Sequence, residues 1–563
     1  MLSKISKDKK ITVSHILLIT VLIAIIYSNS INVGFLWDDK ALIKNNVYVK
    51  SPTKIAEVFK SDWGAGAGKR YNFYRPLATL SYMLNYSLDR LNVRYYHIFN
   101  ILLHILVGIS LYWLLRLLLL NRLLSLLTTL LYISHPIHTD SVTYLSGRAG
   151  ILVALFVVTG FMLYIKSTNK KSKTLFSLSL ISYILSLLSK ESALIFVLII
   201  FCYHYIFNLK IDKLKIVSLT IVTFIYLFIR SSIIESSLIA NLISLNFIQR
   251  IPGFFVAIVD YLRILIIPYG LHFDYGKLTF SWGYYKTLLG LFIFIGSIYY
   301  ALKTKNRDRV LSLSILWFSI ALIPVSNIFY PLPFYMSEHY LYIPSIGFFL
   351  IFIVLITKLI KKLDKSKQLK ISIYLFLVSL ITTYSSLTYR QNNYWKNPIT
   401  FYKHIIKYNP KSTNAYINLG CEYREMSDIN NAYLCYKKAL DLDKNNEETY
   451  NNLGFIYLTK GNIRSAIASF EKAIELNPQY GSAYTNLGNL YSSQKEIDKA
   501  LPLYKKAIEI NPNDASAFYN LAVTSFIRKR YSLAKEYCLK ALELGFDKAH
   551  PDFLKTLKIK NNR

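Results

Sequence analysis

Long apolar blocks alternate with short charged connectors over residues 1–389, and an amphipathic helical pattern follows them. The first block, residues 11–31, follows a lysine-rich start and predicts an uncleaved first span with a cytoplasmic N-terminus. Several of the other apolar blocks are short for a membrane-spanning helix. These other blocks lie near 97–115, 123–139, 149–165, 174–189, 192–208, 214–230, 252–268, 284–301, 310–325, 340–358 and 370–388.

Basic connectors predict the topology, because loops rich in Lys and Arg stay on the cytoplasmic side. Four such connectors are Lys166–Lys173, Lys210–Lys215, Lys303–Arg309 and Lys358–Lys370. Three apolar blocks separate the second connector from the third. Because both connectors are predicted to be cytoplasmic, an even number of these blocks must cross the membrane. We expect 252–268 not to cross, since it carries two charged residues and ends at Pro268. Eleven spans result, with the C-terminal part outside; if 252–268 crosses, the count is twelve.

A second periodicity begins after residue 412. Asn-Leu-Gly recurs at 418, 452 and 486, and Asn-Leu-Ala follows at 520, so the period is 34 residues. This spacing, with small residues where two helices touch, is typical of the tetratricopeptide repeat (TPR). It predicts a linker and half repeat over 390–412, repeats at 413–446, 447–480, 481–514 and 515–548, and a tail over 549–563. The groove of such an α-solenoid binds an acceptor polypeptide or partner protein, or the repeats serve as a spacer or oligomerisation platform.

Composition supports a membrane protein. Of 563 residues, 53% are apolar, which is too many for one soluble domain. The net charge of +34 does not indicate nucleic acid as a partner, because Lys and Arg gather in short loops between apolar blocks. The four cysteines form neither a CxxC pair nor a zinc spacing, so they indicate packing.

Polar clusters interrupt the apolar blocks on the predicted outer side. Ionisable residues at membrane depth are costly and are usually retained for a site or for one another. Five clusters on one side therefore predict a shared polar cavity. They are Trp37-Asp38-Asp39, Arg75, the group of His135, His138, Asp140 and Arg148, Lys190-Glu191, and Glu338-His339.

The ordered set of motifs resembles the transmembrane and TPR-containing protein O-mannosyltransferases, and more broadly the polyprenyl-phosphate-sugar-dependent glycosyltransferases of the C-type fold. The resemblance covers nearly the whole chain, and departs from the family where Asp140 replaces a common Glu and His339 a common Arg. The segments that carry it are Gly34-Phe35-Leu36-Trp37-Asp38-Asp39, Tyr74-Arg75-Pro76-Leu77, His97-x-x-Asn100-x-x-x-His104, His135-Pro136-Ile137-His138-Thr139-Asp140, Gly147-Arg148, Lys190-Glu191-Ser192, Pro268-x-Gly270-Leu271-x-x-Asp274-Tyr275 and Glu338-His339-Tyr340-Leu341.

The resemblance implies an all-α fold, with a multi-span glycosyltransferase domain over 1–389 whose first outer loop is 32–95. It implies transfer of a sugar, with mannose the first candidate, from a polyprenyl-phosphate carrier to Ser or Thr of a protein or to another extracytoplasmic acceptor. It points to Asp38 or Asp39 as general base, and we favour Asp39 slightly. The alternative is an acidic turn after a span.

The leaving phosphate needs positive charge, and the candidates are Arg75, Arg148 and Lys190, each of which is otherwise an interface anchor. Substrate-positioning roles are expected for His135, His138, Asp140, Glu191, Glu338 and His339. No metal is expected, because Pro136 disrupts the helical spacing of the two histidines. No cofactor is expected either, since the donor is a lipid-linked sugar and the chain has no P-loop or Rossmann glycine fingerprint.

Two other function classes remain. A membrane scaffold or assembly protein would use the repeats alone, yet an anchor needs one span rather than eleven. A transporter needs polar residues near the middle of its spans. Asp260 and Arg263 are the best candidates for such residues, and they are few. We expect a multi-pass protein of the plasma (inner) membrane with extracytoplasmic repeats, or of the endoplasmic reticulum in a eukaryote.

Overall fold

The computed structural model describes residues 2–119, 121–234, 246–276, 278–332, 334–362, 366–546 and 548–559. Within these ranges the regular structure is entirely helical, which confirms the all-α prediction. The chain forms two compact units. The membrane unit comprises Met1–Lys44, Tyr48–Trp63 and Arg70–Phe401, and the repeat unit comprises Asn45–Val47, Gly64–Lys69 and Tyr402–Arg563.

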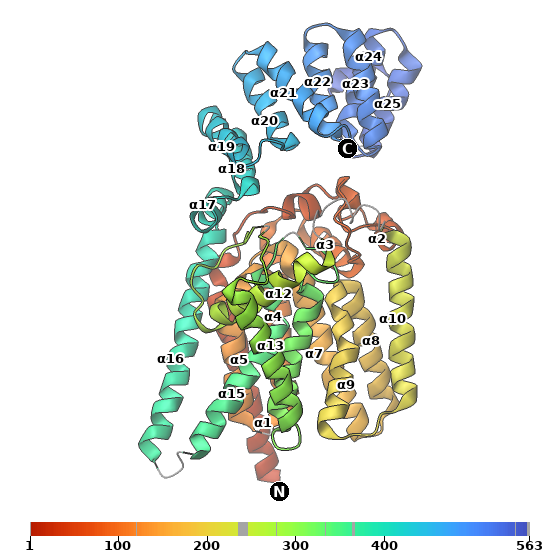
Figure 1. Ribbon diagram of the computed structural model, residues 1–563. Coiled ribbons are helices and arrows are strands. Elements are labelled where there is room, and N and C mark those ends of the chain that lie inside the picture. The colour runs from red at the N-terminus through yellow and green to blue at the C-terminus, as the bar shows by residue number, and fades with distance from the viewer. Residues whose placement is uncertain are drawn as a thin grey trace. The chain divides into compact units, whose positions relative to one another are not determined.

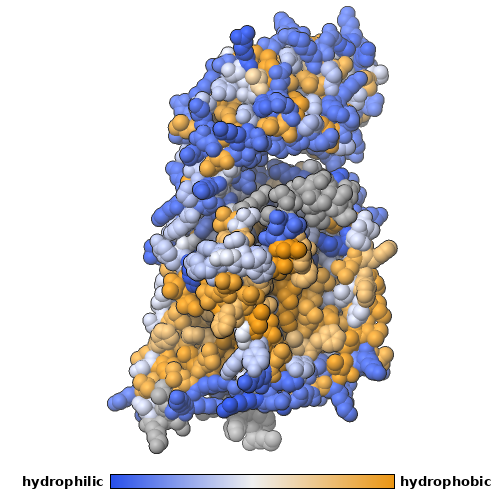
Figure 2. Space-filling model, in the orientation of Figure 1, coloured by the Kyte–Doolittle hydropathy of each residue, from blue (hydrophilic) through white to orange (hydrophobic). Residues whose placement is uncertain are grey.

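The membrane unit is a bundle of apolar helices with a large hydrophobic core and two smaller clusters of buried apolar residues among those described. Its long elements are α1 (Leu2–Ile26), α4 (Val93–Leu119), α5 (Arg122–Ser134), α7 (Arg148–Asn169), α8 (Lys173–Ser189), α9 (Ile195–Phe207), α10 (Lys213–Ile233), α12 (Phe247–Ile266), α13 (Tyr285–Thr304), α14 (Arg309–Leu322), α15 (Pro344–Lys362) and α16 (Lys367–Asn392). Six helices of the described residues are long and apolar enough to cross a membrane. A broad band of hydrophobic residues crosses the face of this unit that Figure 2 shows. The predicted polytopic bundle is confirmed, and the count of eleven spans stays a prediction.

Two ends of the bundle differ in character. The α9–α10 and α13–α14 connectors lie at the same end as the start of α1 (Figure 1), and Asn208 of one connector donates to Asn306 of the other at 3.3 Å. We call this the basic end. At the opposite end, α16 finishes beside α1, where Asn392 donates to the Ile26 carbonyl at 2.9 Å. We call this the loop end, because the first long loop follows α1 here.

Helix α12 contacts its neighbours only near the loop end. The Tyr384 hydroxyl of α16 donates to the Leu265 and Ile266 carbonyls, and Asp260 accepts from Lys286 at the start of α13 at 2.7 Å. Gly290 of α13 lies so close to the Phe255 carbonyl that a Cβ would collide with it. Helix α12 is not among the six candidate spans. That 252–268 does not cross remains a prediction.

Short elements connect the spans at the loop end and carry most candidate site residues. They are η1 (Ser28–Ser30), η2 (Lys40–Lys44), η3 (Pro52–Lys54), α2 (Ile55–Phe59), α3 (Pro76–Asp89), η5 (Pro136–His138), α6 (Thr139–Val142), η6 (Leu145–Gly147), η7 (Glu191–Leu194), η8 (Ile323–Val325), η9 (Glu338–Leu341) and η10 (Asn393–Trp395). Gly147 is required at one junction, since a Cβ there would lie 2.5 Å from the Asp140 carbonyl oxygen. This close approach sets the position of the turn before α7.

The repeat unit consists of stacked helix pairs, which confirms the predicted TPR solenoid. The first helix of each pair begins at Thr413, Glu447, Gly481 or Ala515, every 34 residues. The elements are α17 (Pro398–Tyr408), α18 (Thr413–Glu425), α19 (Ile429–Leu442), α20 (Glu447–Thr459), α21 (Ile463–Leu476), α22 (Gly481–Ser493), α23 (Ile497–Ile510), α24 (Ala515–Ile527), α25 (Tyr531–Glu543) and α26 (Pro551–Thr556), with η4 (Ala65–Ala67) from the first loop.

Candidate active site

Asp39 is held inside the first loop. It is 1% exposed, and its Oδ1 accepts from the Ser146 amide at 2.7 Å and the Ser146 hydroxyl at 2.5 Å. Its Oδ2 accepts from the Leu36 amide at 3.1 Å. Burial raises the pKa of Asp39 to about 7, although these hydrogen bonds act in the opposite direction. Asp39 therefore fastens the first loop to the turn before α7.

Asp38 faces a different direction and is only half-buried. Its Oδ1 accepts a hydrogen bond from the Tyr71 hydroxyl at 2.8 Å, and its own amide donates to the Tyr144 hydroxyl at 3.1 Å. The residue before it, Trp37, has φ 43°, in the left-handed region that bulky side chains rarely adopt. Such backbone strain is typical of functional sites. The two carboxylates that follow Trp37 have different partners, Tyr71 for Asp38 and Ser146 for Asp39.

An aromatic cluster holds this strained segment. The Trp37 ring lies 5.1 Å from that of Phe273, and Phe273 lies 6.1 Å from Trp395. The Tyr144 ring stacks on Trp395 at 5.7 Å. These contacts bring together the first loop, the segment after α12 and the end of α16.

Arg75 forms the centre of the cationic region. It donates to Glu191 through Nη2 at 2.6 Å and Nε at 3.2 Å, which is a bidentate ion pair. Its guanidinium also lies 4.1 Å from the Phe73 ring and 4.7 Å from the Trp63 ring. The indole of Trp63 in turn lies 6.2 Å from Tyr71, the partner of Asp38. The acid and the cation therefore line one continuous region.

Lys190 adjoins this pair between α8 and η7. Its side chain is buried, with Nζ 5.8 Å from the Tyr340 ring. Burial, together with the charge of Arg75, lowers the pKa of Lys190 to about 8. A lysine of this kind gains charge stabilisation when an anion binds beside it.

Arg148 is surrounded by protein. It is 0% exposed, and Nε donates to Asn100 at 2.6 Å. Nη1 donates to Asn85 at 2.6 Å and to Ser81, and Nη2 donates to the Tyr96 carbonyl at 3.0 Å. The guanidinium thus joins α3, α4 and α7 directly beside the Asp39–Ser146 contact. Its geometry is that of a positioning residue, with no side open to a phosphate.

Asp140 and His339 form a second pair. Asp140 Oδ2 lies 2.9 Å from His339 Nδ1 and accepts from the His339 amide at 3.1 Å. The neighbouring Glu338 is buried and accepts from the Tyr275 hydroxyl at 2.8 Å. Burial, with the charge of Asp140, raises the pKa of Glu338 well above its usual value. Glu338 is therefore suited to the protonated state.

His135 and His138 lie deeper, among aromatic rings. The His138 ring is 4.4 Å from Tyr132 and 4.8 Å from Tyr342, and the His135 ring is 4.5 Å from Tyr384. Both histidines are 0% exposed. Among the described residues, no group of three or more His, Cys, Asp or Glu is arranged to hold a metal ion. The structure does not bring these histidines to Asp38 or Arg75.

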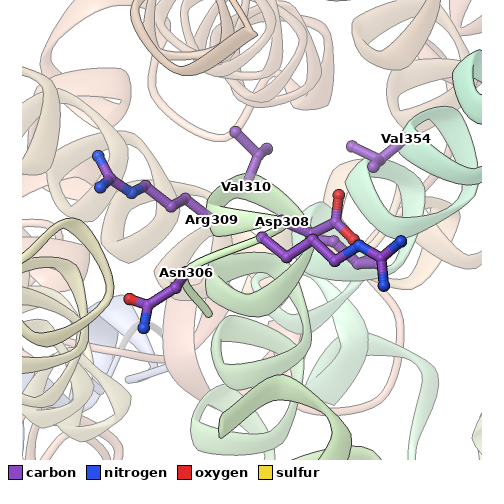
Figure 3. Close-up of a pocket in the computed structure, with 7 residues that line it drawn as sticks. Asn306, Asp308, Arg309, Val310 and Val354 are labelled. Atoms are coloured by element: carbon purple, nitrogen blue, oxygen red, sulfur yellow. The ribbon is translucent and has the colours of Figure 1, made fainter. Parts of the chain in front are cut away.

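An open surface hollow lies away from the candidate site residues. A cavity of about 370 Å³ at the basic end is lined by the α13–α14 connector and α15, and its residues include Asn306, Asp308, Arg309 and Val354 (Figure 3). Asp308 is paired there with Lys358 at 2.7 Å. None of the candidate site residues lines this hollow.

Several site residues were not predicted from the sequence. Tyr71, Ser146 and Tyr275 hold candidate carboxylates through hydroxyl groups, which no spacing signals. Arg230, at the loop end of α10, lies 5.6 Å above the Tyr330 ring. A signal for Arg230 existed, because an arginine at the outer end of a span departs from the usual cytoplasmic bias of basic residues.

Comparisons with known proteins agree with this architecture. Models of the tetratricopeptide repeat match residues 447–480, 481–514 and 503–536, and a TPR repeat model matches 420–461. The chain is 27% identical to Protein O-mannosyl-transferase F38B6.6 of Caenorhabditis elegans, over 74% of this chain and 60% of that protein. It is 24% identical to Protein O-mannosyl-transferase TMTC3 of Homo sapiens, over 73% of this chain and 49% of that protein. Its curated relatives are protein O-mannosyl-transferases.

The resemblance inferred from the ordered motifs is therefore confirmed. The chain spans about half to three fifths of the length of these relatives. Among solved structures, the crystal structure of MamA is 32% identical over 26% of this chain and 85% of that chain, with a TM-score of 0.23. The names of the curated relatives support a membrane glycosyltransferase role.

Proposed function

We propose that this protein transfers a sugar, mannose being the first candidate, from a polyprenyl-phosphate carrier to Ser or Thr of an extracytoplasmic polypeptide. The observation that carries the proposal is the half-buried carboxylate of Asp38, held by Tyr71 in the region that also contains Arg75 and Lys190. The names of the relatives support the reaction class. No cofactor is needed, because the lipid phosphate activates the sugar.

Asp38 is the general base of this proposal. The acceptor hydroxyl oxygen forms a bond to the anomeric carbon while its proton passes to Asp38. The bond between the anomeric carbon and the phosphate oxygen breaks, and its electron pair leaves with the polyprenyl phosphate. Asp39 is less suited to this step, since Ser146 and Leu36 already occupy both of its oxygens. This assignment reverses the slight preference for Asp39 from sequence.

Lys190 and Arg75 stabilise the charge that grows on the leaving phosphate. Glu191 keeps Arg75 oriented through its bidentate pair. Arg148, expected from sequence to bind phosphate, instead positions the turn that holds Asp39, because its donors are directed at protein acceptors. Asp140, His339 and Glu338 shape the acceptor side of the same region.

The repeats would recruit or position the acceptor. Stacked TPR helices form a concave groove that binds extended peptide segments. We place them outside the cytoplasm, because α16 ends at the end of the bundle opposite the basic connectors. The membrane is then the plasma (inner) membrane, or the endoplasmic reticulum in a eukaryote.

The test uses purified full-length protein, undecaprenyl-phosphate mannose carrying a radiolabel, and a Ser/Thr-containing acceptor protein. Asp38→Asn is expected to lower kcat by a factor of about 10² to 10⁴, the usual contribution of a general base. Asp89→Asn is the matched control, since Asp89 is a half-buried acid at the end of α3 whose Oδ2 accepts from the Asn92 side chain at 2.7 Å. Unchanged transfer by Asp38→Asn would remove the base assignment, and no transfer by the wild type would favour a non-enzymatic scaffold.

A further inference from the structure

The loop end of α10 carries polar groups that the proposed mechanism has not used. Tyr226 and Arg230 lie one helical turn apart on this helix, so they share a face. The Tyr226 hydroxyl and the Arg230 Nε are both buried, and neither has a hydrogen-bond partner among the residues that the structure describes. Buried polar atoms without partners are costly and are usually explained by a ligand or water.

These two groups face the cationic region around Arg75. The Tyr226 ring lies 6.2 Å from the ring of Tyr74, the neighbour of Arg75. The charges that act on the Tyr226 hydroxyl are those of Glu191, Arg230 and Arg75. Arg230 and Lys190 are therefore both close to the Arg75–Glu191 pair.

The acids of this region already have hydrogen-bond partners. Arg75, Lys190 and Arg230 are cationic, whereas the acids that act on the neighbouring Tyr330 hydroxyl are Glu191 and Asp62. Both Asp62 oxygens accept backbone hydrogen bonds, from the Tyr71 and Phe73 amides at 2.9 and 3.0 Å. Glu191 accepts from Arg75, and Asp140, whose charge also acts on Lys190, accepts from the His339 amide.

The surface of α10 shows where a lipid tail would lie. The helix has the most exposed apolar window of the six candidate spans, with 11% of it buried. Phe224 and Phe228 are 67% and 75% exposed, in the turns before Arg230. These two rings lie on the face of α10 opposite Tyr226 and Arg230, because helix positions two residues apart differ by about 200°. They mark the depth at which lipid tails meet the helix, and Arg230 lies at the height of a headgroup.

We infer that Arg230 and Tyr226 bind the phosphate of the lipid-linked sugar donor, with the lipid tail along α10. The inference rests on the proposed function and adds two residues to its donor site. Arg230 supplies a guanidinium fork and Tyr226 a hydroxyl donor to the phosphate oxygens. Lys190, which is also close to the Arg75–Glu191 pair, completes the site.

The test measures binding of undecaprenyl phosphate, the expected product, to full-length protein in detergent micelles by native mass spectrometry. Arg230→Gln is expected to weaken binding about tenfold, as for loss of one charge-assisted hydrogen-bonding group. Arg230→Lys should retain part of the affinity, and Tyr226→Phe should lose about threefold, as for one neutral hydrogen bond. Arg94→Gln is the matched control, because Arg94 is an exposed arginine at the same end of the bundle that donates to Asn32.

Undecaprenol and phosphatidylglycerol separate the alternatives. Undecaprenol lacks the phosphate, so its binding should not change in Arg230→Gln; equal loss for both lipids would show a structural role and overturn the inference. Unaltered undecaprenyl phosphate binding by Arg230→Gln would overturn it too. Equal competition by phosphatidylglycerol would replace the donor with a general anionic lipid. Because binding is measured without transfer, a wild type that binds but does not transfer refutes the proposed function alone.

Discussion

In the candidate active site, side chains of the same type have different roles because they differ in burial and in hydrogen-bond partners. Asp38 and Asp39 are adjacent, yet one is half-buried with Tyr71 as a donor and the other is enclosed by Ser146 and Leu36. Burial raises the pKa of Asp39 to about 7, but its enclosed carboxylate already accepts from Ser146 and Leu36, so a substrate hydroxyl has less access to it than to Asp38.

Lys190 provides a pH-dependent test of phosphate binding. Its pKa of about 8 means that the ammonium loses its proton as pH rises through 8, well below the usual value for lysine. The value of kcat/KM for the lipid-linked donor should therefore fall above pH 8, by about tenfold per pH unit at most. Lys190→Arg, which stays charged, should remove this decline; the same decline in that variant would exclude Lys190 as its cause.

Residue roles were the part least predictable from the sequence. The order of the motifs identified Asp38, Arg75 and Lys190 as candidates. It could not distinguish the roles of Arg75 and Arg148, because both are arginines in motifs on the predicted outer side. Only the fold shows that Asn85, Asn100 and the Tyr96 carbonyl enclose Arg148. Hydrogen-bond partners distant in sequence leave no periodic signal.

Helices were more predictable than residue roles, because the apolar and small residues that form their contacts recur at regular spacing. The 34-residue spacing places a small residue wherever two repeat helices touch, and the structure shows why. A Cβ on Gly454 would lie 2.6 Å from the Phe470 ring, which is itself buried. The length of an apolar block, by contrast, does not decide whether its helix crosses the membrane. Length alone therefore could not show whether α12 and the shorter helices are membrane spans.

Helix contact in the repeats can be tested with two glycines. Gly454→Ala should lower the free energy of unfolding of the repeat unit by about 1–3 kcal/mol, because the added methyl group overpacks the contact with Phe470. Gly481→Ala is the control: its Cβ would meet its nearest atom at an ordinary 3.5 Å, and alanine favours the helix. Thermal unfolding by circular dichroism measures both, and equal stability of the two variants would contradict the close-packing argument.

At the scale of the whole molecule, the two units have separate hydrophobic cores. The clusters within the repeats contain repeat residues only, and each links neighbouring helices. Stacked repeats of this kind fold through contacts between neighbours. A fragment spanning residues 398–559 should therefore be helical and unfold cooperatively without the membrane unit.

That fragment provides the last prediction, which concerns how the two units divide the reaction. If the repeats recruit the acceptor polypeptide, excess free fragment should compete for it and raise the apparent KM of the full-length protein for a protein acceptor. Transfer to a short Ser/Thr peptide that occupies only the catalytic region should be unaffected, and so should undecaprenyl phosphate binding. A radiolabel transfer assay with both acceptors measures the difference. A groove that binds the acceptor must lose part of it to excess free fragment, because both compete for the same polypeptide. Absence of competition would therefore favour the repeats as a spacer or oligomerisation platform.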